Sequence, residues 1–247
     1  MRLIFHASLF FLLTVLTQIV GLAWVASRLF KRPLWMFAVL YVSFSVASVV
    51  VAPQFGRVAL PCFDDGPLLM RSLLFCVLSR HYVVPEMRSV ALILADTVNN
   101  AFPGTVTSVL DGSFPFLDGF PLLPHLSHDD GKKLDLAFYY EDETGYLPGR
   151  TPSPFGYFAF EDGPTDCKTR LPTLRWDLKW LQPIWLQLDL DENRLRTALN
   201  ALAADPRVGK ILVEPHLVDR LGAQHPKIRF QGCRAARHDD HIHFQLD

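Results

Sequence analysis

Charged side chains are missing from two long stretches near the N-terminus. Residues 3–26 and 34–51 contain no Lys, Arg, Asp or Glu. A helix of about 20 apolar residues spans a bilayer, and a helix that is apolar on every side is stable only in lipid or in a very large core. The rest of the chain is too short to build such a core, which excludes a wholly soluble fold. We therefore predict two transmembrane helices within residues 1–53.

Basic residues are also scarce around these stretches, except in the short connection between them. Arg28, Lys31 and Arg32 lie in that connection, whereas only Arg2 precedes the first stretch and only Arg57 closely follows the second. The positive-inside rule places the connection in the cytoplasm. We expect the N-terminus and the chain after about residue 53 to lie across the membrane. In a bacterium this means an inner-membrane anchor with its domain in the periplasm or outside.

The chain has few cysteines and no excess of positive charge. A formal net charge of −1 offers no basic surface for nucleic acid. No two of the four cysteines have the Cys-x-x-Cys spacing of a zinc site. All four follow the apolar stretches, and an oxidising compartment permits disulfides. We predict Cys62–Cys76, which closes a short loop, and Cys167–Cys233, whose partners flank the candidate site segments. The oligomeric state stays open.

The remainder of the chain alternates helical and extended patterns. Proline and glycine punctuate residues 60–67, so we expect residues 54–79 to be a linker. Residues 141–168 are expected to form a long surface loop, and residues 214–216 a short one. Apolar spacing predicts helices over 85–102 and 192–204, and strands over 105–110, 134–140, 208–213, 228–230 and 241–246. This pattern favours an α+β domain over residues 80–247 with a central antiparallel sheet.

Histidine is concentrated in two short segments. Five of the nine histidines lie in residues 125–135 and 238–244. Side chains alternate between the two faces of a strand, so His241 and His243 project from one face. One of these two, together with His128 and Asp135, supplies about three nitrogen or oxygen ligands, which is what a catalytic zinc needs beside an open position for water. The pattern predicts zinc-activated hydrolysis.

The spacing within the two segments is specific. Residues 127–135 read Ser-His-x-x-Gly-x-x-x-Asp, with His125 ahead of them, and residues 238–243 read His-x-x-His-x-His. These paired motifs resemble those of the penicillin-insensitive murein endopeptidases, which belong with the lysostaphin, D-Ala-D-Ala peptidase and hedgehog-type zinc fold. The resemblance covers roughly residues 80–247 and excludes the apolar stretches.

The resemblance implies a role for each of the clustered residues. His128, Asp135 and His243 would bind Zn²⁺. His241 would act as a base or would stabilise the oxyanion, while His125 and His238 would complete the polar cluster.

The resemblance also implies a zinc metallopeptidase that hydrolyses peptide bonds in peptidoglycan cross-links, and the apolar stretches predict that it is membrane-anchored. Two alternatives stay open at this point. One is a carboxypeptidase that trims a terminal D-Ala. The other is a noncatalytic, zinc-stabilised module that holds a cell-wall peptide or a partner protein. An enzyme keeps one metal position open for water, whereas a structural site fills all positions with protein ligands.

Overall fold

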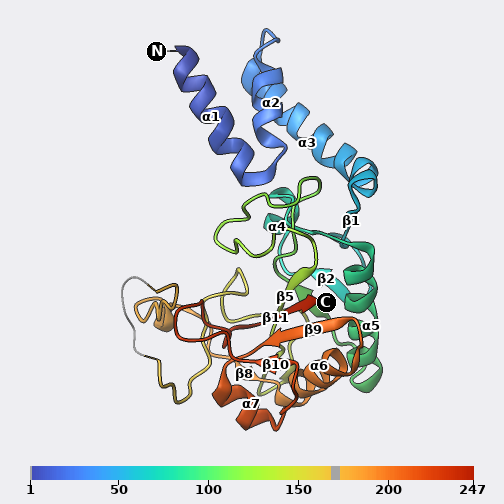
Figure 1. The fold of residues 1–247 in the computed structure, drawn as a ribbon, viewed down its shortest axis with the longest axis vertical. Helices are drawn as coiled ribbons and strands as arrows, with labels where there is room; N and C mark the ends of the chain where they lie inside the picture. Colours follow the sequence, from blue (N-terminus) through green and yellow to red (C-terminus); the bar gives the residue numbers. More distant parts are fainter. Residues whose placement is uncertain (1, 168–172) are drawn as a thin grey trace. The chain divides into compact units, whose positions relative to one another are not determined.

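The computed structural model describes residues 2–167 and 173–247 (Figure 1). The chain forms two compact units, and each unit combines three separate segments. The first unit contains Met1–Leu60, Leu73–Arg88 and Asp111–Lys133, and the second contains Pro61–Ser72, Ser89–Leu110 and Leu134–Asp247. Helices and strands are mixed along the chain, as the α+β prediction requires. The units differ from the expected division at residues 53 and 79, because the chain passes repeatedly from one unit to the other.

The first apolar stretch forms two helices where one was predicted. Helix α1 spans Arg2–Thr17 and helix α2 spans Val20–Ser27. The chain turns at Gln18, whose φ is 63°. The Thr17 hydroxyl oxygen accepts hydrogen bonds from the N–H groups of Ile19 and Val20, at 3.2 and 2.9 Å, and thereby caps α2. The prediction of one long helix was wrong, because the chain turns at Gln18 and the N–H groups at the turn find hydrogen-bond partners nearby.

Helices α1 and α2 are antiparallel. The rings of His6, near the start of α1, and Trp24, near the end of α2, have centroids 5.8 Å apart. A Cβ atom on Gly21 would lie 2.0 Å from the Thr14 hydroxyl oxygen, so only glycine allows this close approach. The N-terminus and the basic connection, residues 28–32, therefore lie at the same end of the pair (Figure 1). A single long helix would instead place them at opposite ends.

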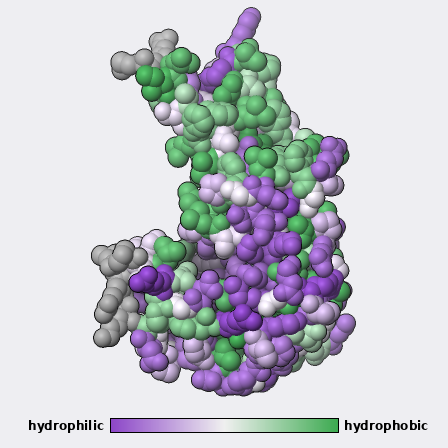
Figure 2. Space-filling model, viewed as in Figure 1, coloured by the Kyte–Doolittle hydropathy of each residue, from purple (hydrophilic) through white to green (hydrophobic). Residues whose placement is uncertain are grey.

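The second apolar stretch is a single helix. Helix α3 spans Pro33–Val51 and continues into the short 3₁₀ helix η1, Ala52–Phe55. Among the described residues, Pro33–Phe55 is the one segment long and apolar enough to cross a membrane. Figure 2 shows a largely hydrophobic surface over the N-terminal helices. Leu3, Trp35 and Val50 are 83%, 70% and 76% exposed there, which favours an apolar environment around these helices.

The rest of the first unit packs on these helices. It contains the short helix α4, Leu73–Val77, and a two-stranded antiparallel sheet of β1, Val58–Ala59, and β3, Tyr82–Val83. The hydroxyl of the fully buried Tyr82 lies 2.6 Å from the Ser48 hydroxyl of α3. The Gln18 side chain accepts hydrogen bonds from the N–H groups of Phe116 and Leu117, at 3.1 and 3.3 Å. The loop that carries the first histidine segment is thus attached to the helices.

The second unit is built on a six-stranded sheet in the order β10-β9-β11-β5-β4-β2. The prediction of an antiparallel sheet is confirmed only in part. β9 pairs antiparallel with β11, and β4 with β5, whereas β10 pairs parallel with β9 and β2 with β4. The sheet is therefore mixed. Its strands are β2 Leu68–Met70, β4 Thr107–Val109, β5 Lys133–Ala137, β9 Val208–Leu212, β10 Ile228–Arg229 and β11 His241–Leu246.

Residues 54–79, the expected linker, contribute to this folded structure. Strand β2 lies within them, because a run of three apolar residues pairs with β4 along the edge of the sheet. Proline and glycine before that run obscured it in the sequence. The expected surface loop over 141–168 also contains structure: β7, Gly145–Tyr146, pairs with β6, Tyr140–Asp142, which in turn pairs with β8, Asp189–Leu190.

Two predicted helices are present, and a third was missed. Helix α5 spans Pro85–Ala101 and α6 spans Glu192–Ala204. Leu195, Leu199 and Leu202 of α6 are buried, and α6 packs beside β9 (Figure 1). Helix α7, Pro215–Leu221, follows Glu214 directly, where we expected a loop. Proline at the first helical position starts a helix, because its missing N–H would have no partner there. The one remaining element is the 3₁₀ helix η2, Gln182–Ile184.

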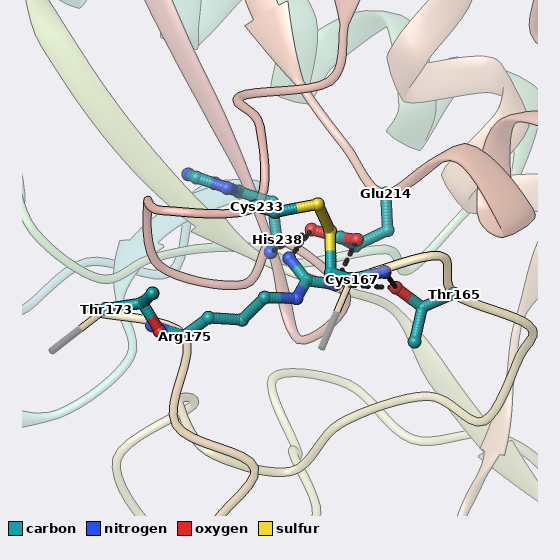
Figure 3. Close-up of a disulfide and its surroundings, with 7 residues drawn as sticks. All are labelled: Thr165, Cys167, Thr173, Arg175, Glu214, Cys233 and His238. Carbon is teal, nitrogen blue, oxygen red and sulfur yellow. Dashed lines mark hydrogen bonds and ion pairs between the residues drawn. A yellow bond between two sulfur atoms is a disulfide. The ribbon is translucent and has the colours of Figure 1, made fainter. Parts of the chain in front are cut away.

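The prediction that the cysteines are oxidised is confirmed, as is the Cys167–Cys233 pairing. Cys167 is bonded to Cys233, and Cys62 and Cys76 are also disulfide-bonded, so none of the four thiols is free. Next to the Cys167–Cys233 bond, the Arg175 guanidinium binds both oxygens of Glu214, at 3.0 and 2.6 Å (Figure 3). The same carboxylate accepts a hydrogen bond from the His238 N–H at 3.3 Å. The disulfide and this buried ion pair hold the segment that enters β11.

Candidate metal centre

Strands β5 and β11 bring the predicted Asp135, His241 and His243 together. One Asp135 carboxylate oxygen lies 2.8 Å from Nδ1 of His243, and the other lies 3.8 Å from Nε2 of His241. The Tyr157 hydroxyl donates a hydrogen bond to that second oxygen at 2.7 Å. All four side chains are buried, and Asp135 is only 1% exposed. Strand alternation places the two histidines on one face, while Ile242, between them, is buried in the core.

A second carboxylate orients His241. Nδ1 of His241 lies 2.5 Å from one oxygen of Asp240, and the other oxygen accepts a hydrogen bond from the Phe158 N–H at 2.6 Å. These contacts fix the imidazole ring and direct its Nε2 toward Asp135. Asp240, the residue before His241 in the sequence, is therefore the carboxylate that orients this imidazole.

Asp239 is instead bonded to Arg237. Burial raises the pKa of the Asp239 carboxyl to about 6, although the hydrogen bond and positive charge of Arg237 lower it. The neighbouring carboxylates Asp240 and Glu214 also raise this pKa. Asp239 is therefore held by Arg237, which bonds to both of its carboxylate oxygens.

His238 completes the histidine cluster of the second unit. Its ring centroid lies 5.1 Å from that of His241 and 5.7 Å from that of His243. The His238 side chain is buried, and its backbone is tied to Glu214 in both directions, at 3.1 and 3.3 Å. Three histidines and Asp135 thus form one buried group around the start of β11.

The first unit positions His125 and His128 in the loop after residue 111. Nδ1 of His128 donates a hydrogen bond to the carbonyl oxygen of Gly112 at 2.9 Å. Such a bond places the proton on Nδ1 and leaves Nε2 as the nitrogen that can bind a metal. The same loop holds His125, whose ring centroid lies 5.6 Å from that of His128.

Asp111 and Arg80 support His125. Nδ1 of His125 lies 2.9 Å from Asp111, whose carboxylate also binds the Arg80 guanidinium at 2.5 and 2.7 Å. Burial raises the pKa of the Asp111 carboxyl, but the His125 hydrogen bond and the Arg80 charge outweigh it, so the net pKa is lowered. Asp111 is therefore an ionised partner that orients His125.

Two groups of residues have side chains arranged so that they could hold a metal ion. His125, His128 and Asp135 form one group of residues that could hold a metal ion, and Cys62, Cys76 and His81 form another. The second group is excluded as a metal site, because its sulfur atoms are in disulfides and a metal requires the thiolate.

The donor chemistry of the first group and of β11 fits zinc. Imidazole nitrogens and a carboxylate oxygen are zinc ligands, and two ligands of a tetrahedral zinc are about 3.3 Å apart. Asp135 and His243, 2.8 Å apart, are at hydrogen-bond distance and so lie closer together than two zinc ligands would. A divalent cation also stabilises a buried carboxylate that lies among imidazoles.

Sequence reasoning missed several side chains that support these residues. Tyr157 lies in the proline- and glycine-rich stretch 141–168, where nothing in the pattern marks one aromatic residue above another. Asp111 and Arg80 are far apart in the sequence and meet only through the fold of the first unit.

No protein-family model and no curated protein sequence matches the chain.

Proposed function

We propose that this chain is a membrane-anchored zinc peptidase that hydrolyses peptide bonds in peptidoglycan cross-links. His128, Asp135 and His243 are the zinc ligands in this proposal. The observation that carries it is the buried contact of Asp135 with His243, with His241 and Tyr157 on the second oxygen of the same carboxylate. The motif resemblance supplies the substrate class.

The residues around the ligands have distinct tasks. Bound zinc would supply a Lewis acid that makes water a nucleophile near neutral pH and polarises the scissile carbonyl. His241 accepts and returns a proton at Nε2, a task that suits a group titrating near neutral pH. Asp240 holds the ring and stabilises its protonated form. Tyr157 fixes the second oxygen of Asp135 and so orients the carboxylate.

The anchor and the disulfides support an extracytoplasmic location. Residues 33–55 would span the inner membrane, with the basic connection at 28–32 in the cytoplasm. The rest of the chain then lies in the periplasm, where disulfides form. Because α1 and α2 are antiparallel, the N-terminus lies on the cytoplasmic side in this arrangement.

The direct test is digestion of purified muropeptides by the full-length chain in detergent. We expect cross-linked dimers to be converted into monomers, to stop when a chelator is added, and to resume when zinc is restored. Mass spectrometry of the products identifies the bond that is cleaved. A chain that retains zinc and binds cross-linked muropeptides without any product would contradict the enzyme and favour the noncatalytic module.

A further inference from the structure

A cavity of about 350 Å³ in the second unit combines two guanidinium groups with an apolar wall. Arg71 and Arg150 line it beside the Thr151 hydroxyl, and the proposed catalysis uses neither arginine. Its remaining lining residues are Pro152, Pro154, Ile184, Trp185 and Leu186. A ligand with one charged end and one apolar side fits such a lining.

The two arginines in this cavity repel each other. Nε of Arg71 donates a hydrogen bond to the neutral Thr151 hydroxyl at 2.8 Å, and that hydroxyl donates onward to the Ser153 carbonyl at 2.6 Å. Burial lowers the pKa of the Arg71 guanidinium, and the charge of Arg150 lowers it further. Within the described residues, neither guanidinium forms an ion pair with a carboxylate.

Asp142, a carboxylate that attracts Arg150, forms its hydrogen bonds with another residue. Asp142 accepts two hydrogen bonds from Thr144, at 2.8 and 2.6 Å. These bonds are the main reason that its pKa is lowered, and attraction to Arg150 is the weakest contribution. Two close cations without a counter-charge favour the binding of an anion, and guanidinium groups match the planar geometry of a carboxylate.

The cavity is connected to the Asp135 cluster through one short loop. Thr151 lines the cavity, the Ser153 hydroxyl donates to the Tyr157 carbonyl at 2.5 Å, and the Tyr157 hydroxyl donates to Asp135. A ligand bound by the arginines would thus contact the segment that orients Asp135. Hydrogen bonds within this one loop therefore link the cavity to the residue that orients Asp135.

We propose that Arg71 and Arg150 form a subsite for the carboxylate of an acidic peptide, with Trp185 and Ile184 against its apolar part. The identification of that peptide as the substrate rests on the proposed function, whereas the binding of an anionic peptide does not. The carboxylate has two possible sources, the C-terminus of the peptide and an acidic side chain.

The test is calorimetric binding of synthetic tetrapeptides to the full-length chain in detergent, with a chelator present to prevent turnover. Three probes carry both carboxylates, only the side-chain carboxylate, or only the C-terminal one, and a fourth is fully amidated. We expect the fully amidated probe to bind on the order of 10- to 100-fold more weakly than the acidic one, which is the usual contribution of a charged hydrogen bond. The two singly amidated probes identify the source.

Arg150→Gln should abolish this discrimination, because it removes an exposed guanidinium, and Arg71→Gln should do the same. Arg88→Gln removes an exposed charge outside the cavity and should leave the affinities unchanged. Equal binding of the acidic and amidated probes, or wild-type discrimination by Arg150→Gln in a folded chain, would overturn the subsite. Arginine-dependent binding, by a protein that contains no zinc as purified and releases no product from muropeptides when zinc is supplied without chelator, would support the subsite and contradict the peptidase.

Discussion

The N-terminal helices and strand β11 bury polar groups in opposite ways. In the helices the buried hydroxyls are neutral, and those of Thr17 and Ser27 bond to nearby backbone: the Ser27 hydroxyl donates to the Trp24 carbonyl at 2.7 Å, and the Thr17 hydroxyl accepts from the Val20 N–H at 2.9 Å. On β11 the buried groups are imidazoles whose partners include Asp135, which is 108 residues away from His243 in the sequence.

This difference reflects the surroundings of the helices and the role of the strand. A hydroxyl bonded within its own helix requires nothing from outside, so the outer face of that helix can be wholly apolar and match a lipid environment. Ionisable groups gathered in a core cost free energy, and a folded protein retains them where they serve a site. The following predictions test the two sides of this comparison.

The largest expected effect concerns the orientation of the helices. A reporter that is active only in the periplasm should be active when fused after Asp247 and inactive when fused ahead of residue 1. The reason is that α1 and α2 are antiparallel and the basic connection stays inside. Activity of the N-terminal fusion would show that α1 crosses the membrane as an independent span, contrary to the contact between His6 and Trp24.

Substitution of His241 should separate chemistry from metal binding. His241→Ala should retain zinc and fold while the rate of muropeptide cleavage falls on the order of 10²- to 10⁴-fold, the usual contribution of a positioned acid–base group. Asp240→Asn should lower the rate less, because the ring keeps a partner. Wild-type turnover by His241→Ala would remove this residue from the mechanism.

The ion pair beneath β11 should matter for stability more than for chemistry. Glu214→Leu leaves the guanidinium of Arg175 buried without its carboxylate, and loss of one partner of a buried pair costs about 3–5 kcal/mol. Urea unfolding of the detergent-solubilised chain measures this loss. The double variant Arg175→Met/Glu214→Leu should recover most of it. A double variant as unstable as the single one would show that packing, and not the unpaired charge, determines the cost.

The smallest effect contrasts an isolated histidine with those of β11. His81 is buried beside the Tyr82 ring, at 4.4 Å between centroids, and burial lowers its pKa to about 4. In the unfolded chain the His81 side chain therefore takes up a proton near pH 6.5, whereas in the folded chain it stays neutral until the pH is near 4. The free energy of unfolding should therefore fall by about 3 kcal/mol as the pH falls from about 6.5 to about 4.

His81→Phe should flatten this part of the pH profile, whereas His225→Ala, which removes an exposed histidine, should leave it unchanged. Denaturant unfolding at a series of pH values provides the measurement. An unchanged slope in His81→Phe would assign the acid sensitivity to other groups.

The sequence predicts best where the signal is local. Helix α6 was predicted at its observed limits, because its leucines repeat at helical spacing and Asp191 caps its start. The positions of His241 and His243 on one strand face followed from alternation alone. Both inferences need only neighbouring residues.

The failures arise where structure depends on distant partners or on one unusual residue. Gln18 interrupts an apolar run through a left-handed turn that composition does not reveal. Strand β2 is too short to recognise without β4 beside it. Tyr157 and Asp240 gain their roles only through contacts with Asp135 and His241, so their function could not be read from the sequence.

The most direct test of the central claim is the metal content of the full-length chain, purified in detergent and measured by elemental analysis. The account predicts about one zinc per chain in the wild type and in the exposed-site control His225→Ala. It predicts that zinc is largely lost in His128→Ala, Asp135→Asn and His243→Ala. A wild-type chain without zinc, or a folded His243→Ala chain that keeps it at the wild-type level, would contradict the proposed metal centre.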